Sequence, residues 1–319
     1  MERKKISVVV SVYNEELSLN QFYKTTVSVL DKCVWDYELI FVNDGSQDGS
    51  IELLKGFAKE NAKVKVVDFS RNFGHEAAMI AGIDHAQGDG VVCMDADLQH
   101  PPACIPDIIA KFEDGYEVIS MIRTKNADAG IIKRITSGAF YKVLNLMSPV
   151  KFENNSSDFF AISKNVAGVL RKDYREKIRY LRGYVQSVGF RKTTLEFEAQ
   201  KREAGESKYS IRKLLHFSIN ALCSFSDLPL KLGMYSGVFV ALCGFILMIF
   251  TIINKIVNGA PGYSTIIVVL CFMFAVVLMV IGIIGEYIAV LFAEIKDRPI
   301  YIVRDIYQEE KETHGGEKE

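Results

Sequence analysis

The sequence predicts an α/β protein built on a mainly parallel sheet and followed by a membrane-spanning helical hairpin. Up to about residue 125, short β-branched runs alternate with stretches of helical length, which is the pattern of a parallel sheet with helices on both faces. The later stretches 232–253 and 264–285 each hold 22 residues without a charge. At about 1.5 Å per residue, either stretch would cross a hydrocarbon core about 30 Å thick. Two buried helices of a soluble domain are the alternative, although such uncharged runs are rare in soluble cores.

Composition narrows the class of protein. The 319 residues include 38 Lys plus Arg and 39 Asp plus Glu, and 49% are hydrophobic. The mean hydropathy of +0.14 is high for a purely soluble protein, and the mixture excludes a disordered chain, a collagen and a coiled coil. A net charge of −1 gives no indication of nucleic-acid binding, which usually needs a basic excess. The six cysteines form no C-x-x-C pair, so we expect neither a metal cluster nor a disulfide framework.

The elements of the N-terminal region follow from local pattern. We expect strands at 6–12, 37–42, 64–69, 91–94 and 118–122. We expect helices at 16–33, up to about 60, at 75–86 and at 105–114. Open sheets of this class bind ligands beyond the carboxyl ends of their strands. The residues directly after each strand are therefore the candidates for function.

Polar residues follow four of these strands. They are Tyr13-Asn-Glu15, Asn43-Asp-Gly-Ser46, Ser70-Arg-Asn-Phe-Gly-His75 and Asp95-Ala-Asp-Leu-Gln99. One such loop is ordinary turn chemistry, but four at one sheet edge predict a binding cleft. Asp95 and Asp97 would repel each other without a cation or proton between them. Their oxygens suit Mg²⁺ or Mn²⁺ shared with a substrate diphosphate, whereas an isolated D-x-D would favour a solvated helix cap.

Other signatures are missing from the sequence. There is no G-x-x-x-x-G-K-[ST] segment and no G-x-G-x-x-G after the first strand. The sequence therefore lacks the glycine-rich loops with which P-loop and dinucleotide-binding proteins bind phosphate. The sequence also has no G-x-S-x-G elbow and no H-E-x-x-H spacing, which argues against a serine or zinc hydrolase.

The four loops together resemble glycosyltransferase family 2, which implies a GT-A fold. Within that family, the chain is similar to the polyprenyl-phosphate glycosyltransferases, bacterial relatives of dolichol-phosphate mannose synthase. The segment Arg202-Glu-Ala-Gly-Glu-Ser-Lys-Tyr209 resembles the R-x-x-G-x-S-K-Y segment of that group. The resemblance covers about residues 5–305. In one departure, Ser11 and Val12 precede Tyr13 where the family usually has Pro, which mainly stiffens a turn.

The resemblance implies a UDP-sugar donor site and its residues. The residues implied to bind the nucleotide sugar are Tyr13, Glu15, Asp44, Arg71, Asp95 and Gln99. Asp44 would contact the uracil, and Asp95 and Asp97 would hold Mg²⁺ or Mn²⁺ at the diphosphate. The implied catalytic residues are Asp97 and Asp158, with Asp158 a candidate general base. An acceptor phosphate is largely a dianion at neutral pH, so an orienting role or a structural cap stays open for Asp158.

The implied acceptor is undecaprenyl phosphate. Its phosphate would be bound by Arg123, Lys133, Arg134, Ser137, Arg202, Ser207 and Lys208. Lys133 and Ser137 keep the spacing of an Arg–Ser pair in related enzymes, but Lys binds as a point charge, so Arg134 is an alternative, and so is a solvated basic face. The stretch 210–225 is an amphipathic helix that would lie in the membrane interface or pack on its own domain.

The predicted organisation has four parts. They are a GT-A domain at 1–200, an interfacial and acceptor-binding segment at 201–230, two transmembrane helices within 231–295, and an acidic tail at 296–319. Basic residues flank the outer ends of the hairpin, whereas Lys255 is the only charge in its connecting loop. The positive-inside rule therefore predicts a catalytic domain in the cytoplasm, at the bacterial cytoplasmic membrane. We expect a homo-oligomer in contact with membrane lipid, and a flippase as partner.

The predicted reaction is inverting transfer of one hexosyl unit, glucosyl from UDP-glucose, to undecaprenyl phosphate at the cytoplasmic face. The lipid-phosphate sugar would then be a donor for modifying a cell-surface polymer. Arg179 and Arg182 lie where processive relatives carry Q-x-x-R-W, and the missing Gln and Trp argue against a polysaccharide synthase. Two alternatives stay open, a glycosyltransferase that extends a lipid-linked saccharide and a non-catalytic partner of a flippase.

Overall fold

The computed structural model describes residues 3–124, 156–177, 180–198, 228–258 and 263–309. The chain forms two compact units, one of residues 1–145, 150–208 and 298–319 and the other of 146–149 and 209–297. Several predicted features lie outside the described residues. They are Lys133, Arg134, Ser137, Arg179, Arg202, Ser207, Lys208, the interfacial helix at 210–225 and the boundary at 200/201.

The first unit is built on an eight-stranded mixed sheet with the order β7-β5-β6-β4-β1-β2-β3-β8. Its strands are β1 (Lys5–Val12), β2 (Asp36–Asn43), β3 (Val64–Phe69), β4 (Gly90–Asp95), β5 (Val118–Arg123), β6 (Ser156–Ser163), β7 (Lys192–Phe197) and β8 (Val303–Tyr307). The pairs β1–β2, β1–β4, β2–β3 and β5–β7 are parallel, whereas β6 and β8 run antiparallel to their neighbours. The predicted mainly parallel α/β sheet is confirmed.

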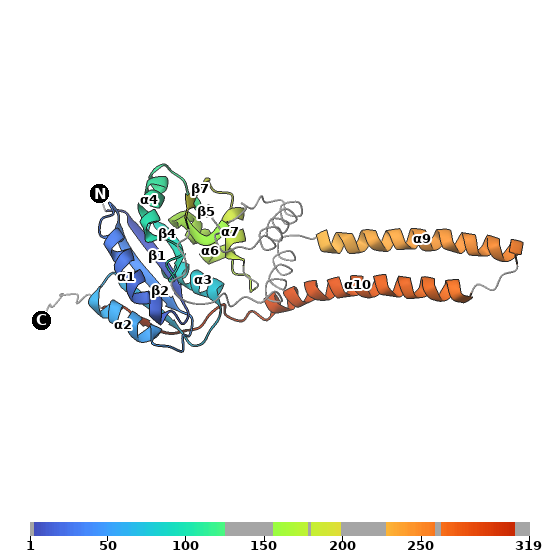
Figure 1. The fold of residues 1–319 in the computed structure, drawn as a ribbon, viewed down its shortest axis with the longest axis horizontal. Helices are drawn as coiled ribbons and strands as arrows, with labels where there is room; N and C mark the ends of the chain where they lie inside the picture. The colour runs from blue at the N-terminus through green and yellow to red at the C-terminus, as the bar shows by residue number, and fades with distance from the viewer. Residues whose placement is uncertain (1–2, 125–155, 178–179, 199–227, 259–262, 310–319) are drawn as a thin grey trace, which may run out of the picture. The chain divides into compact units, whose positions relative to one another are not determined.

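Helices cover both faces of this sheet (Figure 1). They are α1 (Glu16–Leu30), α2 (Ser50–Glu60), α3 (His75–His85), the 3₁₀ turn η1 (Pro102–Cys104), α4 (Ile105–Glu113), α6 (Lys164–Asp173) and α7 (Leu181–Ser187). On one face, Val8 and Val10 of β1 share a core with Phe22 of α1 and Leu54 of α2. On the opposite face, α3 lies so close to β1 that only a glycine, Gly82, fits at the contact. The sheet is therefore buried on both sides, which suits its nearly continuous apolar strands.

The edge strand β8 lies in the segment that the sequence predicts to be an acidic tail. It pairs antiparallel with β3, with Ile306 opposite Val67. Local pattern does not predict this strand, because its short sequence, Val-Arg-Asp-Ile-Tyr, mixes charged with apolar residues. Such a composition is typical of an edge strand whose outer side faces water.

The second unit holds two long helices, α9 (Leu228–Asn258) and α10 (Tyr263–Ile295), which lie side by side (Figure 1). Gly233 of α9 lies against Val280 and Ile283 of α10, so the small residue lets the helices approach closely. The predicted spans fall inside these helices. Within the described residues, 272–295 is long and apolar enough to cross a membrane, and 233–247 is a shorter apolar stretch. Their large apolar side chains face outward, as lipid contact requires.

Two helical glycines give a matched test of the packing between α3 and β1. An added Cβ at Gly82 would overlap Val9 Cγ1 on the buried strand, whereas an added Cβ at Gly56 of α2 would meet nothing within 4 Å. Gly82→Ala is expected to destabilise the protein by about 1–3 kcal/mol through overpacking. Gly56→Ala is expected to stabilise it by about 0.5–1 kcal/mol through helix propensity. Thermal unfolding measures both, and shifts of the same sign would contradict this packing.

Candidate functional site

The carboxyl ends of β1, β2, β3 and β4 lie at one edge of the sheet, because these strands pair in parallel. Hydrogen bonds join the loops that follow β1, β2 and β3. The N–H of Asn14 donates to Ser46 Oγ at 3.0 Å, and the N–H of Gln47 donates to Asn14 Oδ1 at 2.8 Å. Asn14 has a φ of 56°, a left-handed conformation that Asn tolerates better than most residues. The loops after β1 and β2 thus form one hydrogen-bonded unit.

Asp44 connects this unit to the loop after β3. Its Oδ1 accepts the N–H of Phe73 at 2.6 Å, and its Oδ2 accepts the N–H of Gly74 at 2.9 Å. Gly45 beside it has a φ of 67°, and an added Cβ there would lie 2.5 Å from the carbonyl carbon of Arg71. The two loops therefore need glycine at this contact. The structure shows Asp44 holding a loop, and its predicted contact with uracil stays a prediction.

Three other predicted donor residues surround this junction. Tyr13 is 39% exposed, which leaves its ring accessible at the end of β1. Glu15 precedes α1, and its Oε2 accepts the hydroxyl of Ser18 at 3.0 Å. The guanidinium of Arg71 lies 4.0 Å from the ring centroid of Phe73. These residues lie on the joined loops, as the sequence predicts, and their ligands stay predictions.

The first Asp of the D-x-D motif lies between two histidines. Asp95 pairs across the sheet with Ser11, and its oxygens lie 3.6 Å from His75 Nδ1 and 3.6 Å from His100 Nδ1. His75 Nδ1 also lies 2.8 Å from Ser11 Oγ. Burial alone would lower the pKa of His75, but the nearby carboxylates outweigh it and raise the pKa. His75 thus holds its proton to a higher pH than an ordinary histidine.

The second histidine is neutral. Its Nδ1 accepts the backbone N–H of Asp95 at 3.0 Å, so that nitrogen carries no proton. Burial lowers the pKa of His100 despite the surrounding carboxylates, and its ring stacks on Phe159 with centroids 5.1 Å apart. His100 therefore fixes the backbone at the end of β4 and brings no positive charge.

A second group of charges lies beside these histidines. Asp158 of β6 forms an ion pair with Arg182 of α7, with 2.7 Å between Oδ1 and Nε. Burial would raise the pKa of Asp158, but nearby cations, Arg182 foremost, hold it below its ordinary range. Glu76 accepts the N–H of Leu181 at 2.9 Å, and burial, followed by the charge of Asp158, raises its pKa. The pKa values of Asp158 and Glu76 are thus shifted in opposite directions.

The remaining predicted residues lie in the loop after β4. Asp97 Oδ1 accepts the N–H of Gln99 at 3.1 Å, and Gln99 Oε1 accepts an N–H of Arg123 at 3.2 Å. Within the described part of the chain, Nε of Arg123 is buried and has no hydrogen-bond partner. A buried guanidinium N–H without a partner is unfavourable, so Arg123 is well placed to bind an anion.

A metal ion would need ligands from its substrate here. No group of three or more His, Cys, Asp and Glu side chains in the described ranges could hold a metal ion. Asp95 and Asp97 offer two hard carboxylate oxygens, and Mg²⁺ commonly binds through one or two carboxylates plus substrate phosphates. The residues present therefore fit a divalent cation shared with a diphosphate.

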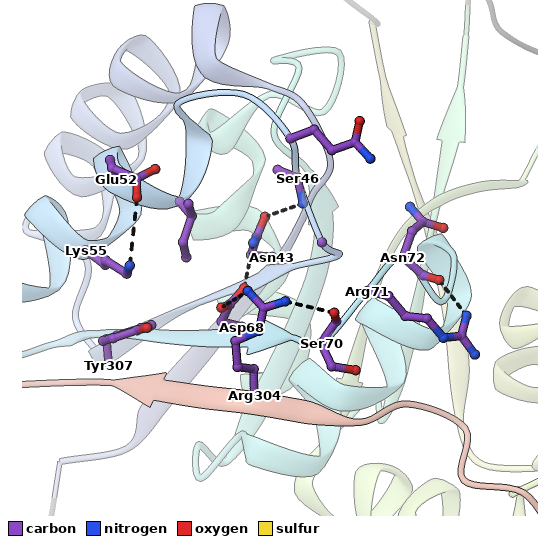
Figure 2. Close-up of a pocket in the computed structure, with 13 residues that line it drawn as sticks. Asn43, Ser46, Glu52, Lys55, Asp68, Ser70, Arg71, Asn72, Arg304 and Tyr307 are labelled. Atoms are coloured by element: carbon purple, nitrogen blue, oxygen red, sulfur yellow. Dashed lines mark hydrogen bonds and ion pairs between the residues drawn. The ribbon is translucent and has the colours of Figure 1, made fainter.

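A pocket of about 560 Å³ is lined in part by the loops after β2 and β3. Figure 2 shows side chains from β2, α2, β3 and β8 around it. It is lined by Asn43, Gly45, Ser46, Gln47, Ile51, Glu52, Lys55, Asp68, Ser70, Arg71, Asn72, Arg304 and Tyr307. The lining includes residues of the loops after β2 and β3 and does not include Asp95 or Asp97.

Sequence reasoning did not assign roles to His75, His100, Glu76 and Arg182. His75 ends the polar loop after the third predicted strand, Glu76 follows it, and His100 follows Gln99. Their closeness to the predicted motifs is the signal that could have identified them. The contact of Arg182 with Asp158 joins segments that lie apart in the sequence, and no local pattern reveals it.

Glu76 gives a pH-dependent test of this arrangement. A raised pKa in the folded state stabilises the protein below the ordinary glutamate pKa of about 4.3, and that stabilisation is lost as the pH rises through the folded-state pKa. Glu76→Gln keeps an acceptor for Leu181 and removes the charge. Its melting temperature should exceed that of the wild type at pH 8, and the difference should shrink toward pH 4. The exposed Glu60→Gln controls for charge alone, and a loss of stability at every pH would refute the assignment.

Comparison with known proteins identifies the family of the chain. Residues 7–170 match the model of glycosyl transferase family 2, and residues 228–291 match the GtrB C-terminal hairpin. The bactoprenol glucosyl transferase of Shigella phage SfII is 37% identical over 302 residues, covering 94% of this chain and 97% of that protein. The uncharacterized glycosyltransferase YkcC of Bacillus subtilis (strain 168) is 40% identical over 303 residues, covering 94% of each.

A solved structure is also similar to the chain. It is glucosyl-3-phosphoglycerate synthase from Mycobacterium tuberculosis in complex with Mn²⁺, UDP-glucose and phosphoglyceric acid. It is 19% identical, with a TM-score of 0.46, and the match covers 69% of this chain and 78% of that one. One family model matches the sheet that carries the site, and another matches the hairpin. The relatives are similar over nearly the full length of the chain. The chain is therefore a membrane-anchored glycosyltransferase of family 2.

Proposed function

We propose that this enzyme transfers one glucosyl unit from UDP-glucose to undecaprenyl phosphate at the cytoplasmic face of the membrane. The observation that carries the proposal is the closeness of acids and arginines around two histidines at one sheet edge. Asp95 and Arg182 lie near His75, and Asp95, Asp97 and Arg123 lie near His100. The acids suit a metal-bound diphosphate and the cations suit a second phosphate. The bactoprenol glucosyl transferase at 37% identity supports the choice of lipid acceptor and sugar.

On the donor side, the joined loops would hold the nucleoside through Tyr13, Glu15, Asp44 and Arg71. Asp95 and Asp97 would bind Mg²⁺ or Mn²⁺ at the diphosphate. Such a cation supplies Lewis-acid stabilisation to a leaving group that gains negative charge. Gln99, held by Arg123 at 3.2 Å, would face the sugar.

On the acceptor side, a phosphate oxygen would attack the anomeric carbon as the bond from that carbon to UDP breaks, with inversion. Arg123 would donate to the phosphate through its unpaired Nε–H. We infer that six further residues, Lys133, Arg134, Ser137, Arg202, Ser207 and Lys208, complete the phosphate site. They lie outside the described residues.

The state of Asp158 refines its proposed role. A carboxylate whose pKa is held low by Arg182 is a weak base, and a phosphate dianion needs little help to attack. We therefore infer that Asp158 orients Arg182 toward the acceptor instead of removing a proton. With this assignment, both arginines face the incoming phosphate.

The hairpin supports a location for the catalytic domain. The basic residues at its outer ends favour a catalytic domain on the cytoplasmic side. We infer a homo-oligomer, and a flippase that carries the lipid-linked sugar across the membrane toward a cell-surface polymer.

Incubation of the purified enzyme with labelled UDP-sugars, Mg²⁺ and undecaprenyl phosphate tests the reaction. The expected product is a lipid-phosphate glucose with the sugar on the phosphate. Formation of no sugar-lipid from any donor would refute the proposal. A product with a glycosidic bond to an existing sugar would instead identify the saccharide-extending alternative.

Asp97→Asn tests the proposed metal site. The substitution keeps an oxygen for the N–H of Gln99 and removes the charge that would bind the cation. We expect kcat/KM to fall by about 100-fold or more, and the Mg²⁺ requirement to rise. Asp107→Asn, an exposed aspartate on α4, is the matched control and should retain activity. Full function of Asp97→Asn in cells would favour the alternative that the protein is a non-catalytic partner of a flippase.

A further inference from the structure

After the membrane hairpin, the chain returns to the sheet of the first unit. Helix α10 ends at Ile295, and residues 300–307, which we call the strap, run along the outer edge of β3. Ile300 is 7% exposed, and the N–H of Ser70 donates to the carbonyl of Ile302 at 3.0 Å. The strap therefore contacts the loop after β3 directly.

Arg304 in the strap reaches the donor loops by two routes. Its guanidinium donates to the carbonyl of Ser70 at 2.9 Å, and it lies 3.8 Å from Asp68 Oδ2. Figure 2 shows the side chain between these two partners. Ser70 opens the loop that carries Arg71, so one route leads to that loop at its first residue.

The second route leads to the loop after β2. Asp68 is 3% exposed, and its Oδ1 accepts the side-chain N–H of Asn43 at 2.7 Å. Asn43 Oδ1 in turn accepts the N–H of Ser46 at 3.3 Å. Ser46 is joined to Asn14 after β1. A chain of contacts thus runs from Arg304 to all three loops of the proposed nucleoside site.

The strap is also anchored on its other side. The ring of Tyr301 stacks on Phe69 with centroids 5.2 Å apart and planes 10° apart. Its hydroxyl donates to Asp84 Oδ2 at 2.6 Å, and Asp84 is paired with Arg175 at 2.9 Å. The contacts of Tyr301 therefore fix the position of the strap close to Arg304, which contacts the loops.

We propose that the strap positions the donor loops and that Arg304 is a positioning residue for nucleotide-sugar binding. The inference rests on the proposed function, because it assigns the loops to the donor. It makes the segment that leaves the membrane hairpin a support of the donor side. A strap that only covers the sheet edge would affect stability and leave donor binding unchanged.

Steady-state kinetics with Arg304→Ala separate these roles. The KM for the UDP-sugar should rise about 3- to 10-fold, the range expected from the net loss of one ordinary intramolecular hydrogen bond. The KM for undecaprenyl phosphate should stay unchanged. Arg304→Lys should recover part of the donor KM, because its ammonium can still donate to Ser70. An unchanged donor KM with a lower melting temperature, or equal rises in both KM values, would overturn the proposal.

Arg3→Ala is the matched control. Arg3 also donates to backbone carbonyls, those of Val34 and Cys33, but it lies before the start of β1, away from the carboxyl edge. Its loss should leave both KM values unchanged. A rise in the donor KM as large as that of Arg304→Ala would show a general effect of losing such an arginine.

Hydrogen–deuterium exchange tests the role of the strap independently of the proposed reaction. In the absence of any substrate, Arg304→Ala should speed exchange in 70–74 and 43–47 relative to the wild type and to Arg3→Ala. If the enzyme turns over no UDP-sugar but exchange in these two segments becomes faster, the proposed reaction is refuted. The inference that Arg304 positions the loops is then still supported. Unchanged exchange in both segments would overturn the strap whatever the enzyme transfers.

Discussion

The parallel pairing of β1 with two neighbours is the constraint on which the site depends. The register places Ser11 opposite Asp95, and Val12 opposite Asn43. Since all three strands end at the same edge, acids and amides distant in the sequence meet there. The close contact between α3 and β1 then brings His75 beside Asp95. The chemistry of the site is thus a consequence of backbone hydrogen bonding in a buried sheet.

Charge balance at this edge is the physical basis for the proposed binding of phosphates and a cation. Asp95, Asp158 and Glu76 lie near one another, and their repulsion is offset by His75 and Arg182. Such an arrangement stores unfavourable electrostatic energy that bound ions relieve. A cation at the acids and a phosphate at the arginines would each lower it. The same feature keeps Asp158 ionised and makes it a weak base.

Local pattern predicted much of this fold, and long-range contact explains what it missed. The strand expected at 64–69 matches β3 at both ends, because a β-branched run between polar turns is a strong local signal. The four polar loops could be predicted to share one edge of the sheet, because each directly follows a strand and these strands pair in parallel. By contrast, the ion pair of Asp158 with Arg182 and the pairing of β8 with β3 depend on tertiary contacts. No periodicity in the sequence encodes such contacts.

We propose that Asp95 and Asp97 bind a nucleoside diphosphate through a divalent cation, and calorimetric titration of the full-length protein tests this binding directly. UDP should bind in the presence of Mg²⁺ and lose about tenfold or more of its affinity when EDTA removes the metal. Uridine, which lacks the diphosphate, should bind weakly and with no dependence on Mg²⁺. Equal affinity for UDP with and without the metal would contradict the account.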